Sequence, residues 1–598
     1  MQSPIPILMT PIGLCKHRDR FCPHDQRTYR HVREMGYNAI ILGFLDQWDE
    51  DLSFLEFYGR SEAVPGLIPD DYRRKNRAEL SRRLKIATEA GLSIYMSIAS
   101  PLGPKSKMFL DNRDPMQSGG SYPGGFTNNP RGQFGKCLGP DEELCVGHPN
   151  VRRFYNELII DIVRSFPEIR GFSIFGGDFY SSMCRKGACP RCGDTPEWQR
   201  FADWVAELAK GARSVRPDVE MYIVNWPWWD EIFKILQRTD RSIGFVISSA
   251  WGFRFGEHGQ RYPSLTPKWW MYDFNANTAP VELGERPGTI AELHDPWSTL
   301  GPAGRKCSGF IDEAARRGNP VIILDELSTS EPVMPFFTPN PLTTLEKLRQ
   351  WKQRTVHGVI DWWGLHRQEA EGWHVDVNRQ AVRQFLRSPE ATDDAILSSV
   401  AKEIYGADAS APAMAAWGEM KKALDGWSII CWHQRMNWPV MMWQSQFYHR
   451  DLTTPPPQAE TPPLGTEKRQ DVCPMEVWQA LAANLQGVIA GYDKALAQYE
   501  KVIDRAALDK AAEARLHRNS IELGRCFHTM GRHTALAYIA ARENRKVDVA
   551  ILCEAIGNLE RIVELSDRVG TFEYRRDWYT EAIGRMRRDV RQRAGTVS

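Results

Sequence analysis

Short apolar runs recur along the chain as far as residue 363, separated by stretches that are predicted to be largely helical. Each run is only a few residues long and ends at glycine, proline or polar residues, which is typical of a strand buried on both faces. Eight such runs are predicted to be strands: residues 5–11, 38–45, 92–99, 170–178, 220–225, 242–248, 320–326 and 358–363.

The alternation of strands and helices, repeated about eight times, predicts a (β/α)8 TIM barrel. The helices are expected at residues 26–35, 77–90, 150–165, 196–215, 305–317 and 342–354. A further strand-like run at 269–274 is either a hairpin arm or the true sixth strand. The competing architecture is a doubly wound open sheet, but no GxGxxG or P-loop follows the first strand. We therefore predict a catalytic barrel over residues 1–380.

Helical periodicity dominates after residue 380, with apolar residues at three- and four-residue intervals. The segment 453–466 is rich in proline and threonine and is expected to be a surface loop or linker. These patterns predict an all-α domain over residues 381–598, which either forms a homodimer or buttresses the barrel. The helices are expected at residues 382–406, 411–428, 475–505, 506–541, 547–568 and 579–594.

The charge and composition of the chain give no reason to expect nucleic acid or a membrane as its binding partner. A formal net charge of +1 gives no electrostatic reason to expect nucleic acid or an anionic membrane. No window holds about 18 continuous apolar residues, so no transmembrane helix is expected. The N-terminus lacks the pattern of a secretory signal, and the twelve cysteines are mostly scattered. A cytoplasmic location is the resulting prediction.

Acidic residues lie at the C-terminal ends of two of the predicted strands, where barrels place their active sites. Asp178 follows the pair Gly176 and Gly177, which allows a ligand to approach the backbone closely. Asp325 and Glu326 end the seventh strand, and the alternation of side chains lets only one of them point into the mouth unless the strand has already ended. We prefer Glu326, with Asp325 tuning its pKa or binding a substrate hydroxyl. The alternative is a structural role for Asp325 and Glu326, either in a salt bridge or as a helix N-cap.

Aromatic and polar residues accompany these acids at the predicted strand ends. The chain holds 21 tryptophans, and tryptophan stacks on a sugar ring as readily as it fills a core. Cleavage of a glycosidic bond needs a proton donor and a second carboxylate, and no metal or cofactor. For Asp46 and Asp361, hydrogen bonding within the lip of the barrel is an equal alternative to substrate binding. The predicted substrate-binding residues are Asp46, Trp48, Asn225, Trp226, Trp228, Asp361, Trp362, Trp363 and His366.

A group of cysteines follows Asp178. Cys184, Cys189 and Cys192 have the spacing C-x4-C-x2-C, which resembles half of a zinc knuckle. The fourth ligand is either Cys145 or Cys137, and Cys145 lies just before the helix that leads to the fourth strand. The prediction is a structural zinc site formed by the first three cysteines and Cys145. Reduced thiols, or a disulfide in an exported protein, are the alternatives.

Residues 143–179, followed by the cysteine-rich segment 184–192, resemble the barrel core of bacterial glycoside hydrolases related to α-glucuronidases and β-hexosaminidases. Residues 400–420 resemble the start of the helical domain that follows such barrels. The resemblance implies that Asp178 is the acid after the fourth strand and that Glu326, or Asp325, is its partner. Hexosaminidases of this type carry Asp-Glu after the fourth strand, where this chain has Gly-Asp, so their mechanism is not assumed.

The sequence therefore predicts a glycoside hydrolase that acts on an oligosaccharide or glycoside through two carboxyl groups. One alternative is a metal-dependent barrel lyase or isomerase acting on a sugar or sugar acid. That alternative needs a His/Asp/Glu ligand set, and the predicted mouth is poor in histidine. The other alternative is a non-catalytic sugar-binding protein, which the fold alone does not distinguish.

Overall fold

The computed structural model describes most of the predicted elements and a few isolated positions between them. The described residues are 6–12, 25–43, 55, 58–63, 70–99, 145–176, 191–225, 228, 231–248, 302–325, 327, 339–354, 356–361, 375–425, 452, 475–569 and 576–595. The strand-like run at 269–274 and the proline-rich segment 453–466 lie outside them.

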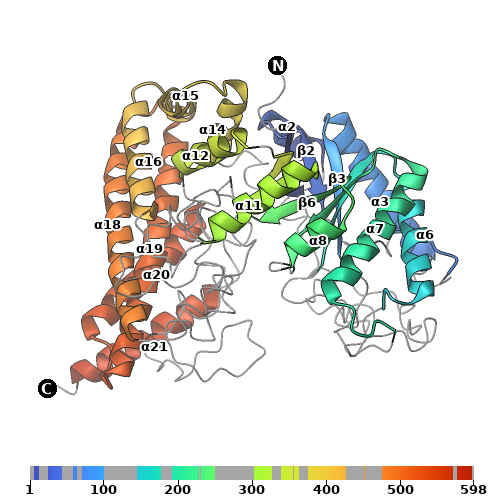
Figure 1. Cartoon of the computed structure of the whole chain (residues 1–598). Helices are drawn as coiled ribbons and strands as arrows, with labels where there is room; N and C mark the ends of the chain where they lie inside the picture. The colour runs from blue at the N-terminus through green and yellow to red at the C-terminus, as the bar shows by residue number, and fades with distance from the viewer. Residues whose placement is uncertain are drawn as a thin grey trace. The chain divides into compact units, whose positions relative to one another are not determined.

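Eight parallel strands close into a barrel in chain order, with β8 pairing back to β1. Figure 1 shows strands of this barrel, β2, β3 and β6 among them, with helices such as α3, α7 and α8 beside them. This arrangement confirms the predicted (β/α)8 barrel. The strands are β1 (Ile7–Ile12), β2 (Ala39–Leu42), β3 (Ser93–Ala99), β4 (Ile169–Phe175), β5 (Glu220–Val224), β6 (Ile243–Ser248), β7 (Val321–Asp325) and β8 (Gly358–Asp361). The helices between them are α2 (Gln26–Glu34), α3 (Asp70–Glu89), α6 (Pro149–Ser165), α7 (Glu197–Val215), α8 (Ile232–Arg238), α11 (Pro302–Arg317) and α12 (Pro341–Lys352).

The strand register separates residues that face the barrel interior from those that face the helices. The ring of Phe245 packs on Phe310 of α11 with centroids 5.2 Å apart, so Phe245 faces the helix layer. Its neighbour Gly244 therefore faces the interior, where it pairs with Tyr222. A Cβ atom at Gly244 would lie 2.5 Å from carbons of the Tyr222 ring. The glycine thus leaves the space that the tyrosine fills.

A carboxylate at the N-terminal end of β5 accepts several hydrogen bonds. Glu220 accepts from the hydroxyl of Tyr95 at 2.9 Å and from that of Tyr222 at 2.6 Å. Arg170 donates its Nε–H to the same carboxylate at 2.7 Å. Burial, reinforced by the nearby charge of Glu220, raises the pKa of both tyrosines. Both hydroxyls therefore stay protonated and act as donors.

The chain divides into two compact units. One takes in the described residues within Met1–Ser248, Gly309–Asp325 and Trp351–Glu371, and holds the strands. The other takes in those within Ser249–Ser308, Glu326–Gln350 and Gly372–Ser598. Its helices after β8 are α14 (Val377–Arg387), α15 (Asp393–Tyr405), α16 (Ser410–Asp425), α18 (Met475–Arg505), α19 (Ala511–Arg542), α20 (Val549–Val569) and α21 (Arg576–Gly595). The prediction that helices follow the barrel is confirmed.

One predicted helix is wrong, because residues 382–406 form parts of two helices. The chain leaves the helical path after Arg387, and Pro389 follows, a residue that has no N–H to donate to a helix. A new helix then starts after Thr392, whose side chain accepts a hydrogen bond from the backbone N–H of Ala395 at 3.2 Å. The break separates α14 from α15.

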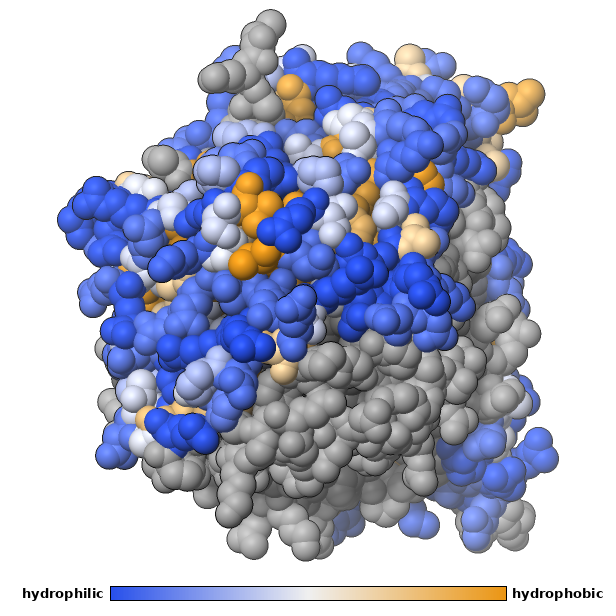
Figure 2. Space-filling model, turned by 90° about the vertical axis from the view of Figure 1, so that its right-hand side faces the viewer, coloured by the Kyte–Doolittle hydropathy of each residue, from blue (hydrophilic) through white to orange (hydrophobic). Residues whose placement is uncertain are grey.

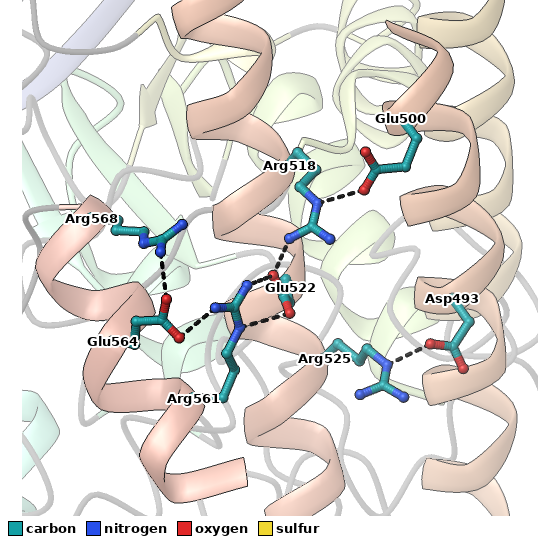
Figure 3. A network of polar contacts seen from close by, with 8 residues as sticks. All are labelled: Asp493, Glu500, Arg518, Glu522, Arg525, Arg561, Glu564 and Arg568. Atoms are coloured by element: carbon teal, nitrogen blue, oxygen red, sulfur yellow. Dashed lines mark hydrogen bonds and ion pairs between the residues drawn. The ribbon is translucent and has the colours of Figure 1, made fainter. Parts of the chain in front are cut away.

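Helices α18, α19 and α20 are joined by a network of ion pairs (Figure 3). Glu522 of α19 accepts from Arg561 of α20 at 2.6 Å and also from Arg518 of its own helix. Arg518 reaches Glu500 of α18 at 2.9 Å. The network therefore links three helices through alternating charges.

The described surface is mostly polar. Figure 2 shows one face of the molecule, on which the described side chains are largely hydrophilic and hydrophobic residues are scattered in small groups. Among the described helices, none combines the length and the apolar character that crossing a bilayer requires.

Candidate active site

The C-terminal ends of all eight strands lie at one end of the barrel, because the barrel is closed and all of its strands are parallel. The strands that precede the predicted acids, β4 and β7, therefore end at the same rim. Of the predicted site residues, the structure describes Cys145, Cys192, Asn225, Trp228 and Asp361, together with the backbone of Asp325. The others lie outside the described residues: Asp46, Trp48, Asp178, Cys184, Cys189, Trp226, Glu326, Trp362, Trp363 and His366.

Asp361 lies in the barrel wall and faces the helices. Phe245, which faces the helix layer, pairs with Val321, and four residues further along β7 Asp325 pairs with Asp361. Since side chains alternate along a strand, Asp361 lies on the same side of the sheet as Phe245. Its carboxylate is fully buried and accepts a 2.6 Å hydrogen bond from the hydroxyl of Tyr37. Both alternatives predicted for Asp361, binding a substrate hydroxyl and hydrogen bonding within the lip of the barrel, stay predictions.

Trp228 packs inside the barrel unit. Its side chain is buried, and its ring lies on that of Phe201 in α7 with centroids 5.0 Å apart. The indole N–H has no hydrogen-bond partner within the described part of the chain. This contact matches core packing, the second role that tryptophan plays in proteins.

Asn225 continues the sheet just beyond β5. Its backbone N–H donates to the carbonyl of Val246 at 3.0 Å, so the pairing of β5 with β6 extends by one residue at the C-terminal rim. The residue is completely buried. Asn225 is therefore held at the end of the barrel where the predicted acids follow their strands.

Two serines make the barrel interior polar between its tyrosine layer and the C-terminal rim. Ser97 of β3 pairs with Ser173 of β4, two residues beyond the pair Tyr95 and Gly171. Both hydroxyls are buried and have no hydrogen-bond partner among the described residues. Buried hydroxyls normally find a partner in protein or ordered water. Their signal in the sequence is a serine that interrupts an apolar run in each strand, between Met96 and Ile98 in β3 and between Phe172 and Ile174 in β4.

Two carboxylates of α6 hold the segment of chain that leads from β2 to α3. Glu157 accepts hydrogen bonds from the hydroxyl of Ser61 at 2.6 Å and from the backbone N–H of Ala63 at 3.0 Å. Burial raises the pKa of Glu157, but these hydrogen bonds outweigh it and the net shift is downward. Asp161 accepts from the backbone N–H of Arg60 at 3.0 Å. The end of the loop that carries Asp46 and Trp48 is thus attached to α6.

Two of the four predicted zinc ligands lie together. The Sγ atoms of Cys145 and Cys192 are 3.3 Å apart, and both side chains are buried. Cys145 comes just before α6 and Cys192 shortly before α7, so the contact joins the loops that follow β3 and β4. Among the described residues, no group of three or more His, Cys, Asp or Glu side chains is arranged to hold a metal ion. The four-ligand set stays a prediction.

No model of a known protein family matches the chain, and no curated protein matches its sequence. Solved structures do match its fold. A GH138 enzyme described as targeting pectin rhamnogalacturonan II superimposes with a TM-score of 0.56 at 11% identity. The match covers 99% of this chain and 84% of that one.

A second match is a GH115 4-O-methyl-α-glucuronidase described as specific for decorated arabinogalactans. Its TM-score is 0.46 at 10% identity, with 96% of this chain and 59% of that chain covered. This superposition is too loose to support an argument. At 11% identity the GH138 match establishes the fold alone, a barrel followed by helices, and this fold agrees with the resemblance to glycoside hydrolases.

Proposed function

We propose that this protein is a glycoside hydrolase that cleaves a glycosidic bond in an oligosaccharide or glycoside. The observation that carries the proposal is the closed barrel, which brings the C-terminal ends of β4 and β7 to one rim. Asp178 follows the described Gly176 by two residues, so covalent geometry keeps its Cα within about 7 Å of that glycine. Glu326 directly follows Asp325, the last residue of β7. Chain connectivity thus supports a pair of carboxyl groups at this rim.

The register of β7 supports Glu326 over Asp325 as the partner of Asp178. Asp325 occupies the position paired with Asp361, on the side of the sheet that carries Phe245 and faces the helices. Glu326 therefore receives the acid–base or nucleophilic role in this proposal, and Asp325 the role of tuning its pKa.

The chemistry then follows from two carboxyl groups on either side of a sugar. One protonates the leaving oxygen, and the other attacks the anomeric carbon or activates a water molecule. A separation of about 5 Å between them gives retention of configuration, and about 6.5 to 9.5 Å gives inversion. We assign Trp48, Trp226, Trp362 and Trp363 to the sugar platform. Asp46, Asn225 and His366 would bind hydroxyl groups.

Trp228 and Asp361 are left out of the substrate-contacting set. The first packs on Phe201 of α7, and the buried carboxylate of the second accepts a hydrogen bond from Tyr37. Both support the barrel wall.

A panel of aryl glycosides tests the proposal. With the best substrate, Asp178→Asn and Glu326→Gln should each lower kcat by a factor of about 100 to 10,000, the usual contribution of a positioned acid or base. The matched control is Asp509→Asn, which removes an exposed carboxylate from the helical unit and should leave kcat unchanged. Full activity in both active-site variants would overturn the proposal, and so would a panel without any hydrolysis.

A further inference from the structure

We propose that Cys145 and Cys192 are ligands of a structural zinc ion that ties together the loops following β3 and β4. The proposal concerns the architecture of the rim and does not depend on the reaction. Zinc favours thiolate ligands, and its structural sites are tetrahedral and closed.

The distance between the two sulfurs fits a shared metal. At 3.3 Å the Sγ atoms are well beyond the bonding distance of a disulfide, about 2.0 Å. Two thiolates on one tetrahedral zinc are about 3.8 Å apart, given Zn–S bonds of about 2.3 Å. A movement of about half an ångström would therefore bring this pair to the separation that zinc requires.

Two glycines near the sulfurs allow the backbone to pass close to both cysteines. A Cβ atom at Gly147 would lie 3.0 Å from Sγ of Cys192 and 3.3 Å from Sγ of Cys145, so only glycine fits between them without displacing a sulfur. Gly193, directly after Cys192, has a positive φ of 49°, a left-handed conformation that glycine adopts without strain. The chain turns there, and the N–H of Thr195 donates to the carbonyl of Cys192 at 3.1 Å.

The proposed role of the zinc ion, to hold two loops of the rim together, follows from the loops on which the two cysteines lie. They are separated by 47 residues in sequence and come from neighbouring βα connections on the rim. The segment that contains Asp178 runs from the end of β4 to Cys192. A metal at Cys192 would fix the far end of that segment, as β4 fixes the near end. Two further ligands complete a tetrahedral site, and Cys184 and Cys189 are assigned to it on their sequence spacing alone.

Metal analysis of the untagged full-length protein tests the proposal directly. The protein, purified under reducing conditions, should hold close to one equivalent of zinc by mass spectrometry. Cys145→Ser and Cys192→Ser should each lose most of it. The control is Cys526→Ser in α19, because burial raises the pKa of the Cys526 thiol to about 12 and keeps it a neutral core group. This variant should retain the metal.

Two measurements keep the test valid if a cysteine variant fails to fold. X-ray absorption on the wild-type zinc protein should show a shell of sulfur ligands at about 2.3 Å. Gly147→Val leaves every cysteine in place but puts a bulky side chain against both sulfurs, which must then shift from their positions, and should lose zinc to a weak chelator faster than wild type. Gly309→Ala, where no atom lies within 4 Å of the added Cβ, should behave like wild type.

Three results would overturn the proposal. One is a wild-type protein without zinc whose thiols all react with a thiol reagent once it is denatured. Another is a disulfide between Cys145 and Cys192 in the metal-free protein, identified by peptide mapping without reductant. The third is zinc that persists in both cysteine variants, because it would then be bound elsewhere.

Discussion

The hydroxyl of Tyr37 donates a 2.6 Å hydrogen bond to Oδ2 of Asp361, a residue 324 positions further along the chain. Tyr37 lies just before β2 and Asp361 ends β8, so the bond spans two strands that are separated by β1 in the barrel. Both side chains are buried, and the donor stabilises a carboxylate that would otherwise be poorly solvated. Nothing in the sequence pattern singles out Tyr37 for this role.

Removing this donor should destabilise the protein without affecting the chemistry. Tyr37→Phe keeps the ring but leaves the buried carboxylate of Asp361 short of one hydrogen bond. We expect a loss of about 1 to 3 kcal/mol in the free energy of unfolding. Urea denaturation of Tyr37→Phe, Asp361→Asn and the double variant measures the coupling between the two side chains. Additive losses would contradict the expected interaction.

Adding one methyl group inside the barrel should be costly. In Gly244→Ala the new Cβ would lie 2.5 Å from carbons of the buried Tyr222 ring, so the ring or the strand must move. We expect a destabilisation of about 1 to 3 kcal/mol or more. Gly309→Ala on α11 meets no atom within 4 Å and should instead stabilise by about 0.5 to 1 kcal/mol. Thermal unfolding compares the two, and similar melting temperatures would be inconsistent with this packing.

The ionic network of Figure 3 should depend on Glu522 far more than on peripheral carboxylates. Burial raises the pKa of Glu522, but Arg561 and Arg518 outweigh it and hold the pKa below its ordinary value. The stabilisation is therefore present at neutral pH and is lost as the pH falls through that lowered pKa. Glu522→Gln should cost about 1 to 3 kcal/mol at pH 7, measured by urea denaturation.

A peripheral ion pair of the same unit supplies the control for Glu522. The carboxylate of Glu581 is 69% exposed and pairs with Arg585 at 3.4 Å. Exposed pairs of this kind contribute little to stability, because water screens both charges. Glu581→Gln should therefore unfold at nearly the same urea concentration as wild type. Equal losses in the two variants would show that burial does not set the strength of these ion pairs.

Acidification should weaken the helical unit through a buried histidine. Burial lowers the pKa of His528 in α19 to about 3, against about 6.5 for an exposed histidine. The unfolded chain therefore takes up a proton below about pH 6.5 that the folded state excludes. Stability is fully present above that pH and falls as the pH drops towards 3, by up to about 1.4 kcal/mol per unit.

A variant pair isolates the contribution of this histidine. His528→Gln should unfold with a shallower dependence on pH between 6.5 and 4 than wild type. Tyr492→Phe removes only the hydroxyl that lies 3.2 Å from the imidazole Nε2, so its pH dependence should stay steep. Urea midpoints at several pH values give the slopes. An unchanged slope in His528→Gln would assign the acid sensitivity to other groups, such as His533, whose pKa burial also lowers.

Local sequence patterns determined most of the secondary structure. The bounds predicted for the helix at residues 475–505 are those of α18, and the run at 92–99 differs from β3 by one residue. Glycines mark two helix ends, because Gly91 after α3 and Gly318 after α11 both have positive φ. Apolar runs, helical periodicity and glycine all act over a few residues, so one chain segment is enough to show them.

The side of the barrel wall on which a residue lies, and the partner that it meets there, were decided only by the tertiary structure. Alternation shows that neighbouring residues of a strand belong to opposite sides, but which side is the inner one follows from the pairing of β6, β7 and β8. For the same reason, Asp361 meets Tyr37 in the wall. Cys145 and Cys192 meet because β3 and β4 are neighbours in the barrel. Such contacts depend on closing the whole sheet, which no local pattern encodes.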